Sequence, residues 1–267
     1  MFNLSSLLIP KIRKNKKVII TFTGGMGAQI LSAAIYFSMR DSGNEVYADL
    51  SYFENPAELA TEGQVGQISQ WAWQLTPFGI NPSDFKSFTN GNILKEHLIA
   101  DGPDKISLAL NALENDATKR YFSIQNITNS TFDLGQNDYL CAHIRRGDYI
   151  NVASHLMPNE VFLNAANKFN SLCKTIVVIS DSRISQELKD GFNSKFEKCI
   201  FLDSIDAITA HCIMRMASVL ICSNSQFSLV AAALNTRGVV LLPKNWGDSV
   251  EIAAVINRLG NFQMLYT

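Results

Sequence analysis

Residues 139 to 149 read Tyr139-Leu140-Cys141-Ala142-His143-Ile144-Arg145-Arg146-Gly147-Asp148-Tyr149. The first part is apolar and predicts a buried strand, and the polar and charged side chains follow at its carboxyl end. In open α/β sheets, ligands bind beyond the carboxyl ends of the strands. Two adjacent arginines suit a diphosphate, because each planar guanidinium can grip phosphate oxygens bidentately. The stretch therefore predicts an α/β protein that binds a nucleotide diphosphate at this strand end.

Similar apolar runs recur on both sides of this stretch, and segments with helical spacing lie between most of them. This alternation is typical of doubly wound α/β folds with parallel sheets. The predicted strands are 18–22, 45–50, 139–144, 175–180, 199–202, 219–222 and 239–242. The predicted helices are 28–42, 158–170, 184–193, 205–217, 227–234 and 248–259.

Residues 51–137 lack this rhythm and are interrupted by prolines, so we expect short helices and loops there rather than further strands. Such an insertion is a natural place for recognition of an acceptor substrate. A boundary near residue 137 divides the chain into an N-terminal domain, 1–137, and a C-terminal domain, 138–267. The pattern alone also permits one continuous sheet.

Composition limits the class of protein. The chain has 267 residues, 47% of them hydrophobic, which is enough for a sizeable core. Its 23 basic and 24 acidic residues nearly balance, which argues against wholesale binding of nucleic acid. The five cysteines show no CxxC spacing and are expected to be buried thiols in a reducing compartment. No apolar stretch approaches the roughly 20 residues that a membrane span needs.

The N-terminal segment combines an apolar run, 2–9, with five basic residues between positions 11 and 17. The apolar part precedes the basic part, which is the wrong order for a signal peptide. Two interpretations stay open: a surface-lying contact with an anionic inner membrane, and a poorly ordered arm. We expect a cytoplasmic protein, either free or peripheral to the inner membrane.

Four segments of the chain carry a family resemblance. Residues 143–149, HIRRGDY, resemble the HxRRGDY signature of the α-1,2-fucosyltransferases, glycosyltransferase family 11. Residues 23–29, TGGMGAQ, are similar to that family's GGLGNQ, residues 178–181 to its second motif, and residues 223–228, SNSQFS, to its SNSTFSWW. The resemblance spans about residues 17–235 and marks a divergent member.

The resemblance implies a GT-B arrangement of two facing Rossmann-like domains with parallel sheets. It also implies an inverting, metal-independent transfer of fucose from GDP-fucose to a hydroxyl of a glycan acceptor, here a surface polysaccharide of bacterial type. No cofactor is expected besides the donor substrate. The expected partners are a nucleotide sugar and a glycan.

The resemblance places an essential arginine at Arg145, which we expect to contact the β-phosphate. Arg146 is expected either to bind substrate or to hold the motif in shape. Asp148 either orients an arginine or serves as the base. His143 either contacts the nucleotide or is a buried structural histidine.

The glycine-rich loop offers Gly25, Gly27 and Gln29 as substrate contacts, because a strand-to-helix loop presents free backbone N–H groups. The alternative is a simple turn. The family's asparagine is replaced by Ala28, and a dinucleotide fingerprint would need glycine where Ile30 stands.

The remaining candidate contacts follow two predicted strands. Ser180 and Asp181 suit either a helix cap or a nucleotide contact. The segment after residue 222 offers hydroxyl and N–H groups to a phosphate or a base. Its candidate residues are Asn224, Ser225, Phe227 and Ser228. The family's tryptophan pair is replaced by Leu229 and Val230.

No Asp-x-Asp motif or cluster of metal-ligand type occurs in the sequence, so we predict that arginines and helix ends stabilise the diphosphate in place of a cation. Three alternatives remain. They are a glycosyltransferase with another nucleotide sugar, a catalytically silent binding protein, and, less favoured, a Rossmann oxidoreductase.

Overall fold

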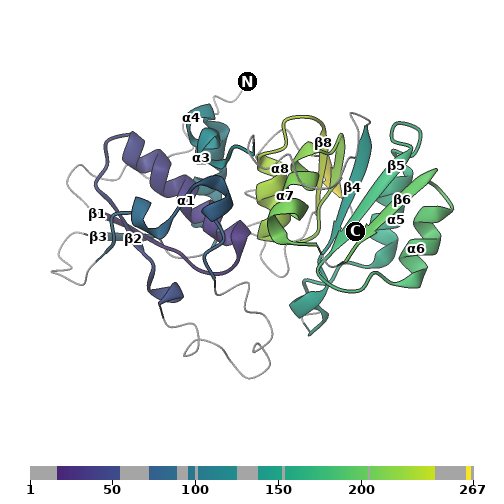
Figure 1. The fold of residues 1–267 in the computed structure, drawn as a ribbon, viewed down its shortest axis with the longest axis horizontal. Coiled ribbons are helices and arrows are strands. Elements are labelled where there is room, and N and C mark those ends of the chain that lie inside the picture. The colour runs from purple at the N-terminus through teal and green to yellow at the C-terminus, as the bar shows by residue number, and fades with distance from the viewer. Residues whose placement is uncertain are drawn as a thin grey trace. The chain divides into compact units, whose positions relative to one another are not determined.

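The computed structural model describes residues 17–54, 72–88, 96–99, 102–124, 138–151, 154–203, 205–243 and 263–265. The chain forms two compact units, Met1–Tyr121 and Phe122–Thr267. The boundary predicted at residue 137 falls at the end of a stretch outside the described residues. Each unit is an α/β layer structure of its own (Figure 1).

The N-terminal unit contains a parallel sheet of three strands in the order β2-β1-β3. These strands are β1 (Lys17–Thr21), β2 (Val46–Asp49) and β3 (Glu96–Ile99). The helices are α1 (Met26–Asp41), α3 (Pro103–Glu114) and α4 (Asp116–Lys119). Short 3₁₀ turns lie at η2 (Ser51–Phe53), η4 (Thr76–Phe78), η5 (Pro82–Asp84) and η6 (Arg120–Phe122).

The expectation that residues 51–137 add no strand to a sheet is wrong, because β3 pairs in parallel with β1. Strand β3 has only four residues, too few for its side-chain pattern to stand out from the loops around it. The helix α3 has 12 residues and is longer than the short helices expected in this region. Its start has a recognisable signal, since Pro103 occupies the first turn, where a missing N–H costs nothing.

The C-terminal unit contains a parallel sheet in the order β6-β5-β4-β7-β8-β9. The strands are β4 (Tyr139–Ile144), β5 (Thr175–Ser180), β6 (Lys198–Leu202), β7 (Val219–Ile221), β8 (Val239–Pro243) and β9 (Gln263–Leu265). Numbered from β4, this is the order 3-2-1-4-5-6 of the Rossmann fold.

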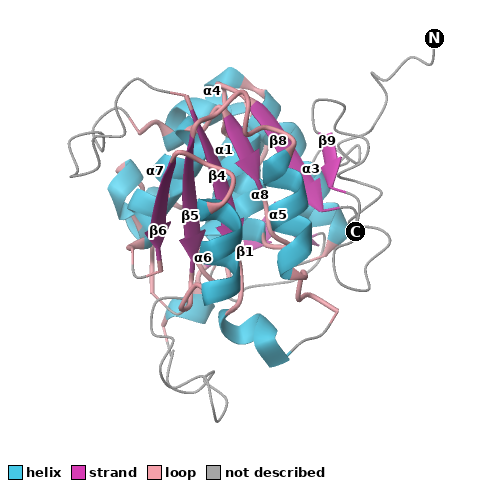
Figure 2. Cartoon of the chain, turned by 90° about the vertical axis from the view of Figure 1, so that its right-hand side faces the viewer, coloured by secondary structure: helices cyan, strands magenta, loops and turns pink. Residues whose placement is uncertain are grey.

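Helices cover both faces of this sheet (Figures 1 and 2). They are α5 (Asn159–Asn167), α6 (Gln186–Asn193), α7 (Ala207–Met216) and α8 (Gln226–Ala233), and a 3₁₀ helix, η7 (Gly147–Asn151), follows β4. The helices α6, α7 and α8 each begin at a side-chain cap: Ser185, Asp206 and Ser225 accept a backbone N–H of the first turn.

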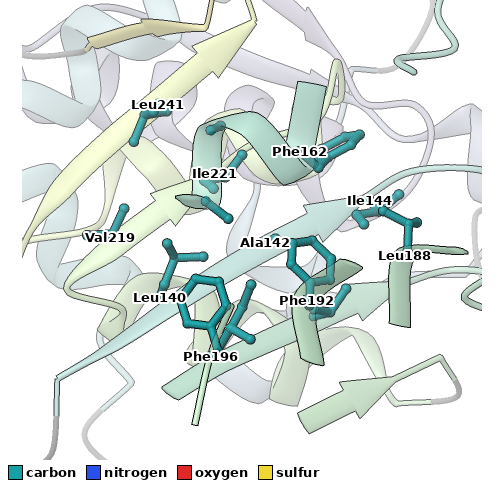
Figure 3. Close-up of a cluster of buried hydrophobic side chains, with 14 of the residues drawn as sticks. Leu140, Ala142, Ile144, Phe162, Leu188, Phe192, Phe196, Val219, Ile221 and Leu241 are labelled. Carbon is teal, nitrogen blue, oxygen red and sulfur yellow. The ribbon is translucent and has the colours of Figure 1, made fainter. Parts of the chain in front are cut away.

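Side chains of β4 alternate between the two faces, as the pleat requires. Leu140, Ala142 and Ile144 belong to the core that packs against α5 and α6 (Figure 3). On the opposite face, Tyr139 donates a hydrogen bond from its hydroxyl to the carbonyl of Ile213 in α7, at 2.6 Å. All side chains of β4 are buried, so only the residues after it reach solvent.

The predicted fold class, α/β with Rossmann-like units and parallel sheets, is confirmed. Each of the seven predicted strands is present within one residue or two of its expected ends. The predicted helix 248–259 and the basic N-terminal segment lie outside the described residues. Among the helices that the structure describes, none is long and apolar enough to cross a membrane. The five cysteines are free thiols, and three of them are buried.

Candidate functional site

The C-terminal sheet reverses its strand order at β4, with β5 on one side and β7 on the other. At such a switch point, ligands bind outside the carboxyl ends of the strands. Three motifs predicted from the sequence follow these three strands: 145–149 after β4, 180–181 at the end of β5, and 223–228 after β7. The fold therefore brings the three motifs together at one edge of one sheet.

Arg145 is held by an ion pair with Asp181. Its Nη1 lies 2.8 Å from Oδ2 of Asp181, and the two side chains are 28% and 23% exposed. The guanidinium carbon also lies 5.3 Å from the centre of the Tyr149 ring, at cation–π distance. Because the pair is partly exposed, its contribution to stability is limited to about 1 kcal/mol. Its effect is to orient a cation at the strand end.

Asp181 also contacts the turn that follows β4. Its Oδ1 accepts hydrogen bonds from the backbone N–H groups of Arg146, at 2.7 Å, and Gly147, at 3.1 Å. Asp181 is not a helix cap, because the N-cap of α6 is Ser185. Its neighbour Ser180 is buried, and the hydroxyl of Ser180 accepts the N–H of Ser182 at 3.3 Å.

Arg146 contacts other residues than Arg145 does. Its Nη2 donates to Oδ1 of Asn159 at 2.7 Å, and its guanidinium carbon lies 5.7 Å from the centre of the Phe162 ring. Asn159 in turn donates to Glu187 at 2.8 Å. Burial lowers the pKa of Arg146, and the carboxylate of Asp181 opposes that change. These contacts support the interpretation in which Arg146 holds the motif in shape.

His143 is buried, with 3% of its surface exposed. Its Nδ1 makes hydrogen bonds with the hydroxyls of Ser228 and Ser223, the latter at 3.0 Å. Burial, and secondarily the charge of Arg145, lower the pKa of His143 to about 3. The imidazole is therefore neutral at pH 7 and supplies no positive charge to a diphosphate. The Phe227 ring lies 5.5 Å from it, centre to centre.

The segment after β7 forms a turn and the start of α8. Ser225 caps this helix by accepting the N–H of Phe227 at 3.2 Å. Asn224 is 3% exposed, and its Oδ1 has no hydrogen-bond partner among the described residues. A buried amide oxygen without a partner is costly, so it is a natural acceptor for a ligand donor.

The glycine-rich loop belongs to the N-terminal unit, where it joins β1 to α1 as predicted. Gly24 has a φ of 68°, a left-handed conformation that favours glycine. Gly25 is the N-cap of α1, and Gly27 is buried in the first turn of that helix. Ala28 also lies in this turn, where the family's asparagine side chain would stand.

Gln29 is buried, and its side chain bonds to main-chain groups. Nε2 donates to the carbonyls of Gly24 at 2.8 Å and Ala72 at 2.9 Å, while Oε1 accepts the N–H of Gln74 at 2.8 Å. The side chain of Gln74 accepts the N–H of Met26 at 3.0 Å. Gln29 therefore ties the glycine loop to residues 72–74. Its predicted contact with substrate stays a prediction.

Asp148 is part of η7, and only its backbone belongs to the described part of the structure. Three contributors were missed by sequence reasoning. Asn159 and Phe162, which hold Arg146, carry no signal that separates them from ordinary helix residues. Lys105 is 3% exposed in the N-terminal unit, and its Nζ donates at 3.0 Å to the carbonyl of Thr21, which lies just before the glycine loop in the sequence.

A cavity of about 660 Å³ opens in the N-terminal unit at the carboxyl end of β2. Its lining combines two carboxylates and three serines with two phenyl rings. The lining residues are Ala48, Asp49, Leu50, Ser51, Phe53, Glu54, Pro82, Ser83, Ser87 and Phe88. Since none of these described residues carries a positive charge, the cavity suits a neutral polyhydroxyl ligand better than an anion.

Within the ranges that the structure describes, no three His, Cys, Asp or Glu side chains are grouped closely enough to hold a metal ion. The predicted independence from metal stays a prediction, because it concerns the reaction.

Two kinds of solved structure are similar to the chain at low identity. POFUT1 in complex with GDP is 10% identical, with a TM-score of 0.44, covering 96% of this chain and 99% of that chain. The E. coli heptosyltransferase WaaC with ADP is 10% identical, with a TM-score of 0.46 and coverage of 93% and 92%. At this level of likeness neither supports a statement about binding or activity. Comparison with curated proteins gave no match.

The sequence profile described as "Glycosyl transferase family 11" matches residues 114–259, which is more than half of the chain. The matched segment contains β4, β5 and β7 with all three motifs at their carboxyl ends. The chain therefore belongs to glycosyltransferase family 11, the α-1,2-fucosyltransferase family, and is a glycosyltransferase.

Proposed function

We propose that this glycosyltransferase moves fucose from GDP-fucose to a hydroxyl of a glycan acceptor, with inversion at the anomeric carbon and without a metal ion. The observation that carries the proposal is the oriented Arg145 at the switch point of a Rossmann-type sheet, within the segment matched by the family. A guanidinium at this position can neutralise the charge of a departing diphosphate, the work that Mg²⁺ does in many other transferases.

In the proposed reaction, the acceptor hydroxyl attacks the anomeric carbon from the face opposite the diphosphate. A new carbon–oxygen bond forms, and the bond to the β-phosphate oxygen breaks, its electron pair leaving with GDP. The hydroxyl proton passes to a base, the part we assign to Asp148. His143 is not assigned the charge-neutralising part, because its depressed pKa keeps the imidazole uncharged.

We assign the glycan acceptor to the cavity at the carboxyl end of β2. Its volume of about 660 Å³ lies in the range typical of small-molecule sites. Serine hydroxyls and carboxylates can bond to sugar hydroxyls, while Phe53 and Phe88 offer apolar surface to sugar rings. The charge of this lining disfavours a phosphate and so separates an acceptor role from the donor role of the arginines.

A second candidate is transfer of a different sugar from another nucleotide. Ala28 favours this candidate, since it removes the polar side chain that the family carries in the first turn of α1. The replacement of the family's tryptophan pair by Leu229 and Val230, both buried in α8, points the same way.

The test is a turnover assay of the full chain with GDP-fucose, GDP-mannose, UDP-galactose and UDP-N-acetylglucosamine, each against a panel of β-galactoside and other glycan acceptors. We expect release of GDP from GDP-fucose with formation of an α-linked fucoside, detected by the anomeric proton signal. Turnover with a UDP sugar alone would redirect the donor. Nucleotide binding without any transfer would indicate a silent relative.

A further inference from the structure

The carboxylate of Asp181 is shared by three consecutive residues of the turn after β4. Oδ2 pairs with the guanidinium of Arg145 at 2.8 Å. Oδ1 accepts the N–H of Arg146 at 2.7 Å and the N–H of Gly147 at 3.1 Å. A guanidinium and two adjacent N–H groups are the donors that an anion site uses, and here they surround a side chain of the protein.

The sheet explains why Asp181 reaches this turn. Strands β4 and β5 pair in parallel, with Ile144 opposite Ser180. Arg145 and Asp181 are therefore the first residues beyond the ends of two neighbouring strands. Because the strands lie side by side, the carboxylate meets the turn after β4 without any long loop.

Gly147 is matched to this carboxylate. A Cβ built on Gly147 would lie 2.4 Å from Oδ2 and 3.1 Å from Cγ of Asp181, so a side chain at this position would displace the carboxylate. The φ of Gly147 is not positive, so its backbone conformation does not by itself require glycine. Position 147 needs glycine because the carboxylate of Asp181 approaches the backbone there.

We propose that Asp181 is a positioning residue that orients Arg145 to grip the donor diphosphate, without itself contacting the nucleotide. This inference rests on the proposed function, and it replaces the predicted contact of Asp181 with substrate. Both carboxylate oxygens are engaged by the protein. The pair with Asp181 is made through Nη1 of Arg145 and fixes the direction of its guanidinium.

The two arginines thus divide the work. Arg146 donates a hydrogen bond to Asn159 and lies at cation–π distance from the Phe162 ring, so its guanidinium packs against α5. Arg145 is oriented by Asp181 and Tyr149 at the solvent edge. Loss of the Asp181 carboxylate should therefore act on GDP through Arg145.

A double-mutant cycle tests this coupling. The affinity for GDP is measured by calorimetry for the wild type, Asp181→Asn, Arg145→Ala and the double variant. Positioning through Arg145 predicts that Asp181→Asn weakens GDP binding about tenfold in the wild type and by less than about twofold when Arg145 is already alanine. An equal loss in both backgrounds would overturn the inference, because it would mean an independent contact with the nucleotide.

Gly147→Ala provides a second variant in case Asp181→Asn does not fold. It keeps every polar group but displaces the carboxylate, so it should repeat the same pattern in the same cycle. Asp190→Asn is the matched control, since Asp190 is an exposed carboxylate of α6 that bonds to Gln186. It should leave the affinity unchanged.

The outcomes separate the two proposals. If the wild type binds GDP, Arg145→Ala weakens that binding, and the effect of Asp181→Asn is additive, then the role of Asp181 is refuted while the proposed function stands. If the wild type binds no nucleoside diphosphate, the proposed function fails and the inference falls with it.

Discussion

Adjacent residues of one motif have unlike surroundings in this protein. His143 is buried and neutral, Arg145 stands in an ion pair at the edge of the sheet, and Arg146 is packed against α5. The end of the strand explains the first contrast, because His143 lies within the buried strand β4 and Arg145 lies beyond its last residue. Identity in a motif therefore does not imply a common role for its residues.

The buried histidines make stability depend on pH. The pKa of His143 falls to about 3, and burial holds the pKa of His211 well below its usual value. At these histidines the unfolded chain binds more protons than the folded chain between about pH 3 and 6.5, so their contribution to stability rises with pH through that window and is complete above it. From pH 8 to pH 5, His143 alone should lower the free energy of unfolding by about 2 kcal/mol.

Urea unfolding at pH 5 to 8 measures this change. In His143→Gln the loss between pH 8 and pH 5 should shrink by about 2 kcal/mol, whatever the stability of the variant at pH 8. Asn167→Gln is the control, because Asn167 is exposed and carries no titratable group, so this change should leave the slope as in the wild type. An identical slope in His143→Gln and the wild type would contradict a buried neutral imidazole.

At the scale of elements, one buried side chain ties the start of α1 to a segment distant in sequence. Gln29 bonds to Gly24, Ala72 and Gln74, and these bonds fix the loop between β1 and α1. A side chain of α1 therefore fixes the conformation of the glycine loop that precedes the helix.

Gln29→Leu should lower the free energy of unfolding by about 3 kcal/mol, because it leaves buried main-chain groups without partners. The measurement is urea unfolding at pH 8, with the aromatic cluster around Trp73 as the fluorescence probe. Gln186→Leu makes the same chemical change at an exposed position of α6 and should cost less than about 0.5 kcal/mol. Equal losses of unfolding free energy in the two variants would show that the hydrogen bonds of Gln29 do not stabilise the fold.

The elements themselves were largely predictable, and the physical reason is their burial. Strands such as Tyr139–Ile144 and Thr175–Ser180 are covered on both faces, so they appear in the sequence as continuous apolar runs. Strand β3 has four residues and a weak pattern, and it was missed. The candidate site was also predictable only in part. The sequence identified Arg145 and Asp181 as site residues. The ion pair between them could not be predicted, because it depends on which strands are neighbours in the sheet, and no local sequence pattern contains that information.

At the scale of the whole molecule, we propose that the two substrates bind to different units. The residues proposed to bind the donor follow strands of the C-terminal unit, and the cavity proposed for the acceptor lies in the N-terminal unit. Each unit has its own parallel sheet. The predicted facing arrangement of the units stays a prediction.

This assignment predicts separable effects on the two substrates. Phe53→Ala removes an apolar wall of the cavity and should raise the KM for the acceptor about tenfold, while the affinity for GDP stays unchanged. Steady-state kinetics with the acceptor varied, together with GDP calorimetry, measures both. Ser194→Ala on the C-terminal unit is a surface control. A fall in GDP affinity with no change in acceptor KM would reject the acceptor site.

The central claim is that Arg145 binds the diphosphate of a guanine nucleotide. Calorimetry of the full chain with GDP tests it most directly, with UDP, CDP and NADH as competitors, EDTA present, and wild type compared with Arg145→Ala. The account predicts GDP-selective binding that EDTA does not affect and that Arg145→Ala weakens by at least about tenfold. Preferential binding of NADH, or unchanged GDP affinity in Arg145→Ala, would contradict it.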